Sequence, residues 1–287
     1  MSSRSQTEKR MARLRTRRLG RTGLLVTELG SGAASVADVP EGEETLLRAF
    51  SLGINFVETG RCYKGSEYLI GRVLQRLGQR GSGIHVASKT LKRSRDGALS
   101  DLERSLSHLG LPKVDIYQLN SVDQEAWGQV MANGGALDGL KEARECGLVD
   151  YIGISSHTVE VLRRAIESQE FDTIQVKYSA FNTAGEALIR LAQERDIGVI
   201  AMKPLGGFGM LGWLKSSPHA GFLNARTLLR YALSNQRLSV VIPGMRFPWE
   251  VEENVALATS YRGMTSAQRG RVRKRAQTFL AEAARAV

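Results

Sequence analysis

Residues 53–90 read GINFVETGRCYKGSEYLIGRVLQRLGQRGSGIHVASKT and contain the unit on which the fold prediction rests. Asn55–Thr59 and His85–Thr90 are short runs of the kind that form buried strands. Between them, Ser66–Leu77 has apolar residues at helical spacing. A strand, a helix and a second strand in this order predict two parallel strands joined by a crossover helix.

The same alternation continues outward to both ends of the chain. It predicts strands at Val26–Gly30, Asn55–Thr59, His85–Thr90, Val114–Leu119, Tyr151–Ser155, Thr173–Tyr178, Gly198–Lys203 and Ser239–Pro243. The helices between them are predicted at Glu41–Leu52, Ser66–Leu77, Gly97–Leu109, Ala136–Glu145, Val159–Glu167, Gly185–Glu194, Ala225–Asn235 and Pro248–Tyr261. Eight such units in about 250 residues predict a closed (β/α)8 barrel.

A doubly wound open sheet is the alternative to a barrel. Such a sheet usually carries G-x-G-x-x-G after its first strand, whereas residues 30–35 read GSGAAS and lack the third glycine. We therefore predict an α/β fold of the (β/α)8 TIM-barrel type. Two additions are expected: a hairpin over Arg18–Val26 that closes the barrel floor, and a C-terminal helix at Ser266–Ala284 capped by Thr265 or Ser266.

The positive charge of the chain is concentrated at its two ends. The formal net charge is +11; residues 1–21 hold eight basic residues against one glutamate, and residues 262–287 hold seven against one. The body between them is slightly acidic, so a basic groove for nucleic acid is not expected. We predict a flexible basic arm at 1–16, which lacks periodicity, and a single barrel domain at 17–287. The basic ends are interpreted as solvated surface, with a weak polyanion contact as the alternative.

The composition also argues against several classes of protein. No stretch approaches the ~20 apolar residues of a membrane helix, and no apolar segment follows the N-terminal basic residues, so neither a membrane span nor a secretory signal is expected. The two cysteines, Cys62 and Cys146, fit a reducing compartment. The four histidines are scattered and suggest no metal site. We therefore expect a cytoplasmic protein without a bound metal.

In a (β/α)8 barrel, functional residues lie where the strands end. The polar residues at the predicted strand ends are Glu58, Lys89, Asn120, Ser155, Ser156, Gln175 and Lys203, and Tyr63 follows in the loop after Glu58. A lysine near a phenol favours the phenolate and lowers its pKa, and a carboxylate would hold that lysine in place. A tyrosine tuned in this way can donate a proton to a developing alkoxide.

The motifs at these strand ends resemble the aldo-keto reductase superfamily over about residues 17–262. In chain order they are Gly53–Tyr63, Gly65–Glu67, Ser88–Thr90, Val114–Asn120, Ile152–Ser156, Gln175–Ser179, Lys203–Gly207, Ile242–Gly244 and Glu253–Asn254. Each motif is weak alone, and their order along the strands carries the resemblance. It implies an NAD(P)H-dependent oxidoreductase that reduces an aldehyde or ketone, a small-molecule carbonyl substrate, to an alcohol.

The resemblance implies catalytic roles for four residues. The family uses an Asp, Tyr, Lys and His tetrad, whose tyrosine protonates the carbonyl oxygen. Tyr63 matches the tyrosine and Lys89 matches the lysine, whereas Glu58 stands at the aspartate position and Asn120 at the histidine position. Glu58 keeps the negative charge, and Asn120 keeps a hydrogen-bond donor but cannot relay a proton. These departures leave a second hypothesis open, a nucleotide-binding homologue with different or no redox chemistry.

The resemblance also implies NADPH, or NADH, as the cofactor. Ser155, Ser156 and Gln175 resemble residues that bind the nicotinamide carboxamide, and Met202 stands where an aromatic ring often stacks on the nicotinamide. Glu250 stands where the family often has an arginine for the 2′-phosphate. The remaining expected cofactor contacts are Gly32, the diphosphate loop Lys203, Pro204, Leu205 and Gly206, the ribose-phosphate residues Gly244 and Arg246, and the adenine residues Glu253 and Asn254.

Three further residues are candidates for the rim of the site. Trp127 and Trp213 are predicted in loops after the fourth and seventh strands, where they would line a substrate pocket. His157 follows the serine pair and is interpreted as structural, with a catalytic base as the alternative. A scaffold that acts through its basic ends is the third hypothesis for the whole chain.

Overall fold

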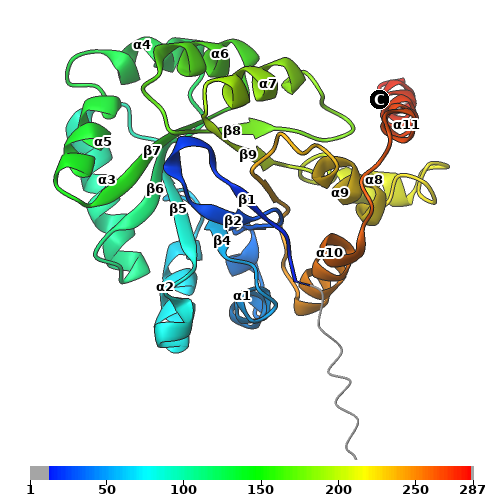
Figure 1. Cartoon of the computed structure of the whole chain (residues 1–287), viewed down its shortest axis with the longest axis horizontal. Helices are drawn as coiled ribbons and strands as arrows, with labels where there is room; N and C mark the ends of the chain where they lie inside the picture. Colours follow the sequence, from blue (N-terminus) through cyan, green and yellow to red (C-terminus); the bar gives the residue numbers. More distant parts are fainter. Residues whose placement is uncertain (1–12, 286–287) are drawn as a thin grey trace, which may run out of the picture.

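The structure is a computed structural model that describes residues 13–285. Eight strands form one sheet in which each pairs in parallel with the next along the chain. They are β3 (Ser31–Gly32), β4 (Phe56–Glu58), β5 (His85–Thr90), β6 (Val114–Leu119), β7 (Val149–Ser156), β8 (Thr173–Lys177), β9 (Gly198–Met202) and β10 (Val240–Ile242). Parallel bridges from Leu29 to Val241 and from Gly32 to Gly244 close the sheet. The predicted (β/α)8 barrel is therefore confirmed (Figure 1).

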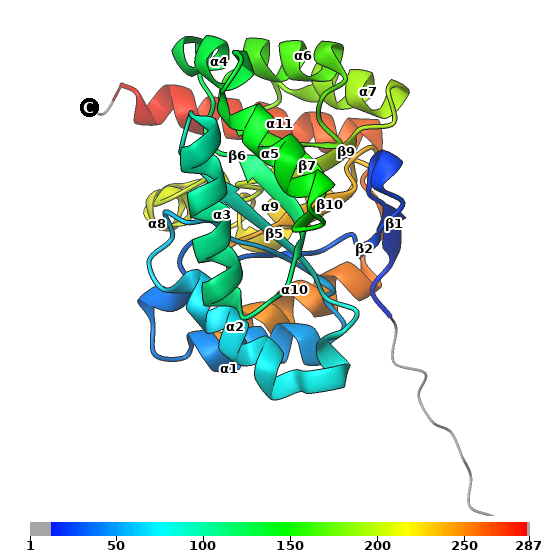
Figure 2. The same ribbon diagram turned by 90° about the vertical axis from the view of Figure 1, so that its left-hand side faces the viewer.

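Helices surround this sheet on its outer face. They are α1 (Gly42–Ser51), α2 (Ser66–Leu77), α3 (Arg95–Leu109), α4 (Gln124–Met131), α5 (Ala136–Glu145), α6 (Val159–Ser168), α7 (Glu186–Glu194), α8 (Met210–Lys215), α9 (Ala225–Leu233), α10 (Pro248–Ser260) and α11 (Ser266–Ala283). Figure 2 shows α3 and α5 lying over the strands from the side. Thr265 caps α11, as predicted, by accepting from the N–H of Gln268. Two of these helices, α4 and α8, were not predicted.

The first predicted strand, Val26–Gly30, is wrong in its position. Leu25–Thr27 (β2) pairs antiparallel with Thr16–Arg18 (β1), so this β-branched run belongs to the N-terminal hairpin. The first barrel strand is β3, whose two residues have little strand propensity and are held by their neighbours. Gly30 makes the barrel closure possible, because a Cβ there would lie 2.8 Å from a side-chain carbon of Val240.

The hairpin closes one end of the barrel, as predicted. Leu19, between β1 and β2, is fully buried in the same cluster as the inward-facing Phe56 and Ile200. The N–H of Arg21 donates to the carbonyl of Asp196, just before β9, at 2.6 Å. Figures 1 and 2 agree that the hairpin lies across the floor of the barrel. The functional residues must therefore be sought at the opposite, C-terminal end.

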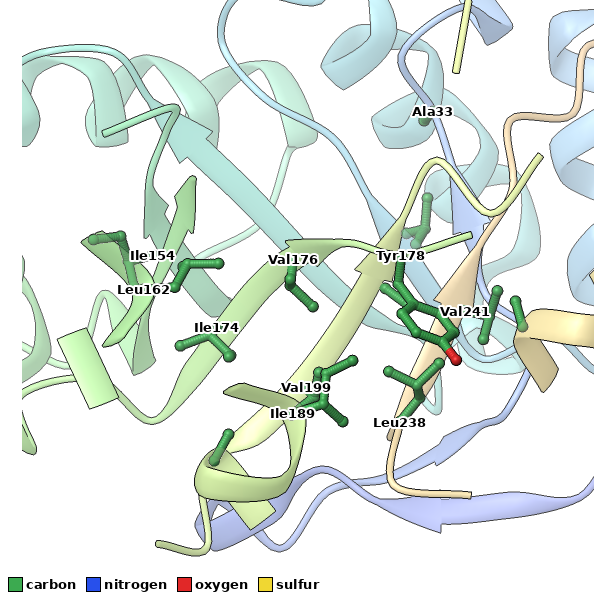
Figure 3. Packing of buried hydrophobic residues seen from close by; sticks show 14 of the residues in the cluster. Ala33, Ile154, Leu162, Ile174, Val176, Tyr178, Ile189, Val199, Leu238 and Val241 are labelled. Carbon is green, nitrogen blue, oxygen red and sulfur yellow. The ribbon is translucent and has the colours of Figure 1, made fainter. Parts of the chain in front are cut away.

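Two apolar layers define which way each strand residue points. One fills the barrel interior, and the other lies between the strands and the helices. Figure 3 shows the outer layer, in which Ile174 and Val176 of β8 lie on the same side as Leu162 and Ile189 from α6 and α7. Because successive strand residues face opposite sides, Gln175 and Lys177 face the barrel interior.

Most of the predicted arm, residues 1–12, lies outside the described residues. Next to it, Leu14 packs against the core and Arg15 pairs with the buried Glu28, with 2.9 Å between Nε and Oε1. Arg17 binds the same carboxylate at 2.6 Å. The extent of the arm stays a prediction. Within residues 13–285, no helix is long and apolar enough to cross a membrane, and no cluster of His, Cys, Asp or Glu could hold a metal.

Candidate active site

A buried ion pair lies at the C-terminal ends of β4 and β5. Glu58 is 2% exposed and Lys89 is 1% exposed. Lys89 Nζ donates to Glu58 Oε1 and, at 2.6 Å, to the carbonyl oxygen of Thr59. Burying two charges is costly unless each is paired and hydrogen-bonded, and both conditions are met here. The two strand-end residues predicted to act together are thus in direct contact.

Tyr63 lies beside this pair in a tight turn after β4. Its N–H donates to the carbonyl of Gly60 at 2.9 Å, and its own carbonyl accepts from the N–H of Ser66 at 3.2 Å. Lys89 Nζ lies over the phenol ring, 4.5 Å from its centroid. The turn and the cation together fix where the phenol sits at the barrel mouth.

The pKa of Tyr63 is raised rather than lowered, contrary to the prediction. Burial, and after it the negative charge of Glu58, raises the pKa of Tyr63 well above its usual range. The neighbouring cation of Lys89 does not reverse this direction. The phenol therefore keeps its proton near neutral pH and is a hydrogen-bond donor rather than a phenolate.

A second buried carboxylate, that of Glu67, stabilises the turn that carries Tyr63. Glu67, 2% exposed, accepts from Arg61 at 2.5 Å and from Ser88 at 2.6 Å. Arg61 belongs to the Tyr63 turn, and Ser88 precedes Lys89 on β5. Glu67 therefore ties the turn to the strand that carries the lysine. The sequence analysis missed this role, although Glu67 lies three residues before the apolar Ile70, on the helix face that is buried.

Asn120 faces the same mouth from the end of β6. Its Oδ1 accepts from Ser155 Oγ at 3.0 Å, and its Nδ2 contacts Cys62 Sγ at 3.4 Å. Burial raises the pKa of the Cys62 thiol, so the sulfur is a weak acceptor. The amide oxygen of Asn120 is thus occupied, whereas its NH₂ group has hydrogen-bonding capacity left for a ligand oxygen.

Two glutamines link the ion pair to the other side of the barrel. Gln118 Nε2 donates to Gln175 Oε1 at 2.9 Å, and Gln175 Nε2 donates to Glu58 Oε1 at 2.9 Å. Gln175 Nε2 also lies 3.7 Å from Met202 Sδ. The structure thus brings Glu58, Gln175 and Met202 together, as the sequence analysis expected, and adds Gln118 to them.

Ser156 is not brought together with these residues. It pairs in register with Val176, which faces the helices, and its Oγ donates to the carbonyl of Val122 at 2.5 Å. The same Oγ accepts from the N–H of Thr158 at 3.0 Å. Its hydroxyl therefore stabilises the loops after β6 and β7, whereas Ser155 faces the mouth.

The loop after β9 carries the predicted diphosphate residues. Pro204 is buried and Leu205 packs against the core, so the start of the loop is anchored. Beyond it, Gly206 and Gly207 have φ of 99° and 108°, values that favour glycine. Lys203 itself has φ of 57° and an exposed side chain. The loop thus presents a lysine and side-chain-free backbone at the barrel mouth.

The start of α10 holds the predicted ribose-phosphate residues. Glu250 Oε2 accepts from the N–H groups of Arg246 at 2.6 Å and Phe247 at 3.2 Å, so a carboxylate already satisfies these donors. Gly244 pairs with Gly32, and apart from its chain neighbours no atom of the described residues lies within 4 Å of where a Cβ on Gly244 would stand. The predicted adenine residues are on α10, with Glu253 exposed and Asn254 partly buried.

Trp127 does not line a pocket, contrary to the prediction. It lies in α4, is 6% exposed and packs near Phe171, with ring centroids 6.5 Å apart. The prediction was wrong because α4 turns this side chain into the core. Trp213 lies in α8 and is 66% exposed, so a contact with a ligand stays a prediction for this residue.

Several known proteins are similar to this chain in sequence. The sequence profile of the Aldo/keto reductase family matches residues 28–227. L-galactose dehydrogenase of Arabidopsis thaliana is 28% identical over 288 residues, covering 87% of this chain and 89% of that protein. Aldo-keto reductase str7 of Strobilurus tenacellus is 28% identical over 225 residues, covering 71% of this chain and 65% of that protein.

Solved structures show the same barrel. The holo form of aldo-keto reductase AKR11C1 from Bacillus halodurans superposes with a TM-score of 0.77 at 22% identity, covering 91% of this chain and 96% of the other. A putative aldo-keto reductase from Pseudomonas aeruginosa gives a TM-score of 0.71 at 25% identity, covering 85% and 94%. The first likeness supports the fold alone.

Proposed function

The chain belongs to the aldo/keto reductase family, and on that premise we propose that it reduces an aldehyde or ketone to an alcohol with NADPH or NADH. Tyr63 is the proton donor in this proposal. The observation that carries it is the buried Glu58–Lys89 pair, whose cation lies over the Tyr63 ring at the C-terminal end of the barrel. A protonated phenol beside a fixed cation suits an oxygen that gains negative charge.

The residues at the mouth fit the chemistry of a nicotinamide dinucleotide. Ser155 Oγ has a lone pair free, and Gln175 Nε2 has one hydrogen opposite only a sulfur, which together suit a carboxamide. Met202 offers a polarizable side chain for one face of a ring. Lys203 and the glycine loop suit a diphosphate. When bound, the nicotinamide supplies the hydride that reduces the carbonyl carbon.

The protein's own residues then act on the carbonyl oxygen. Asn120 Nδ2 donates a hydrogen bond to it and orients the substrate. Tyr63 transfers its proton as negative charge develops on that oxygen. Lys89 stabilises the tyrosinate left behind, and Glu58 keeps Lys89 in position throughout. Because Asn120 cannot titrate, Tyr63 alone supplies the proton.

In this proposal, the preference between NADPH and NADH depends on two residues, Arg246 just before α10 and Glu250 in its first turn. Arg246 is the cation that we propose to read a 2′-phosphate. Glu250 holds the neighbouring backbone N–H groups and places a negative charge beside it. We therefore propose NADPH as the cofactor, with a modest preference over NADH.

A carbonyl screen of the wild-type chain tests the function. Purified protein is given NADPH or NADH with a panel that begins with 4-nitrobenzaldehyde, and nucleotide oxidation is followed by absorbance. L-galactose with the oxidised nucleotides is included, because one relative carries that name. We expect oxidation that depends on the carbonyl compound.

The altered tetrad supports a second candidate, a nucleotide-binding protein without this chemistry. Nucleotide binding without oxidation by any compound of the panel would favour it. Asn120→His separates the two cases further. It should raise turnover of generic aldehydes if Asn120 is a weakened form of the family's histidine, and have no effect if the chain does no redox chemistry.

A further inference from the structure

Arg93, in the loop after β5, binds the backbone of the neighbouring loop that follows β6. Its Nη1 donates to the carbonyl oxygen of Asn120 at 2.9 Å, and its Nη2 donates to the carbonyl oxygen of Ser121 at 3.0 Å. Both loops follow strand ends at the C-terminal face of the barrel. One guanidinium group thus binds two consecutive residues, the first of which is Asn120 of the candidate active site.

The guanidinium group of Arg93 has no carboxylate partner. Within residues 13–285 it forms no ion pair, and its side chain donates only to these two carbonyl oxygens. Burial lowers the pKa of Arg93, and the charge of Asp123 opposes this effect. The carboxylate of Asp123 caps α4 instead, by accepting from the N–H of Ala126 at 2.8 Å. A partly buried arginine that binds backbone carbonyls in this way stabilises one particular conformation of the loop.

The backbone of Ser121 gives an independent observation at the same place. Its φ of 48° lies in the left-handed region, which is uncommon for residues other than glycine. Such a conformation persists only where the surrounding structure holds it. The N–H of Ser121 donates to Ser155 Oγ at 3.0 Å, and its carbonyl oxygen accepts from Arg93. Contacts on both sides of the residue therefore hold this turn in place.

Ser155 connects the turn to the side-chain amide of Asn120. Because Ser155 Oγ accepts from the N–H of Ser121, its own proton is available to Asn120 Oδ1, at 3.0 Å. Ser121 Oγ donates to the same oxygen at 3.3 Å. Two hydroxyl groups on Oδ1 fix which end of the amide is the oxygen, so Nδ2 lies on the other side, near Cys62 Sγ. The turn thus determines which way the amide of Asn120 points.

We propose that Arg93 is a positioning residue, which keeps the NH₂ group of Asn120 directed at the carbonyl oxygen of the substrate. It touches neither substrate nor nucleotide and acts through Asn120 and the Ser121 turn. This inference rests on the proposed function, which assigns the substrate oxygen to Asn120. An amide that rotates by half a turn presents an acceptor where it had a donor. An asparagine at this position therefore depends on a support of this kind.

The free protein tests the positioning without any substrate. The side-chain amide signals of Asn120, assigned with Asn120→Asp, are compared by NMR in the wild type and in Arg93→Met, which keeps a long side chain but no donor. We expect these signals and the N–H signal of Ser121 to shift and broaden. Arg95→Met is the matched control, because Arg95 pairs with carboxylates on α3 and α5, and it should leave them unchanged. Unchanged Asn120 signals in Arg93→Met would overturn the proposal.

Turnover distinguishes positioning from a general contribution to stability. With NADPH and an aldehyde, Arg93→Met should lower kcat/KM by about 10–100-fold, as expected for a misplaced substrate contact, with the dissociation constant of NADPH close to that of the wild type. In an Asn120→Ala background the same change should have no further effect, because its route to the substrate has been removed. Equal losses in the two backgrounds would contradict the proposal.

A second variant covers the case in which Arg93→Met does not fold. Arg93→Lys keeps the charge but loses the planar fork that binds two carbonyl oxygens. It should change the Asn120 signals and kcat/KM in the same direction, by a smaller amount. Circular dichroism checks the folding of both variants.

The two kinds of measurement separate this inference from the proposed function. If no carbonyl compound of the panel is reduced, the proposed function fails, and the Asn120 signals still decide whether Arg93 positions that side chain. If the wild type reduces carbonyl compounds and Arg93→Met reduces them equally well, the proposed function stands and the role of Arg93 is wrong.

Discussion

The two sides of the barrel mouth place lysines in opposite surroundings. On the β4–β5 side, Lys89 is buried and neutralised by Glu58 before any ligand arrives. On the β7–β9 side, burial and then the neighbouring Lys177 lower the pKa of Lys203, and neither lysine forms an ion pair within residues 13–285. A paired, buried lysine can hold a neighbouring side chain in place, whereas an unpaired one at the rim can bind a ligand. The same residue type thus stands in two electrostatic environments at one rim, and we propose a different role for each.

Replacing each lysine by methionine tests this contrast with the largest expected effect. Lys89→Met leaves the carboxylate of Glu58 buried without its cation, which costs about 3–5 kcal/mol of unfolding free energy. Lys177→Met removes a repelled charge and should leave the unfolding free energy unchanged or higher. Urea unfolding of both variants measures the difference. An equal loss in both variants would show that the two sides do not differ.

Glu67→Gln tests whether the contacts of Glu67 stabilise the β4–β5 side of the mouth. The change removes a buried charge that binds Arg61 and Ser88, and contacts of this kind are worth roughly 1.5–3 kcal/mol. We expect lower stability and lower turnover, with nucleotide affinity close to that of the wild type. Glu43→Gln is the matched control, because Glu43 also binds an arginine but at the exposed surface, and it should have little effect. Weaker nucleotide binding in Glu67→Gln would assign this network to the other side of the mouth.

Arg246→Ala and Glu250→Gln test the proposed 2′-phosphate contact at the start of α10. Loss of a charged contact to a 2′-phosphate should reduce the NADPH-to-NADH affinity ratio about tenfold. Glu250→Gln should raise the ratio, because it removes the negative charge beside that phosphate. Fluorescence titration with both nucleotides measures the ratio. A ratio that stays constant in both variants would mean that another residue reads the phosphate.

Removal of residues 2–12 should have the smallest effect. The sequence assigns no barrel element to this segment, and the ion pairs of Arg15 and Arg17 with Glu28 would remain. We expect unchanged nucleotide affinity and an unchanged urea midpoint. Loss of nucleotide binding or of folding would show that the folded domain includes part of residues 2–12.

The outline of the fold could be predicted because most strands carry their own signal. His85–Thr90 and Val114–Leu119 have the predicted bounds, and each is buried at all but one of its positions. β3 could not be predicted, because its Ser31 and Gly32 form a strand only through pairing with β4 and the bridge of Gly32 to Gly244. Barrel closure depends on contacts far apart in sequence, which local propensity does not register.

Contacts in the candidate site were predictable where the barrel topology alone brings two residues together. Glu58 and Lys89 meet because parallel strands of a barrel end at one rim. The pKa of Tyr63 was predicted in the wrong direction, because it depends on burial, and after that on the charge of Glu58, and the degree of burial is set by the fold. The buried Glu67 and the inward-facing Lys177 were not recognised, since their surroundings come from other elements of the fold.

The most direct test of the account is a single-turnover experiment with Tyr63→Phe. The variant keeps the ring over Lys89 and removes only the hydroxyl group that carries the proton. With NADPH bound and an aldehyde substrate added, oxidation of the nucleotide should slow by about 10²–10⁴-fold, as expected for a lost general acid. The dissociation constant of NADPH should stay close to that of the wild type, and Tyr68→Phe, an exposed neighbour, should behave as the wild type does. Oxidation at the wild-type rate in Tyr63→Phe would contradict the assignment of Tyr63 as the proton donor.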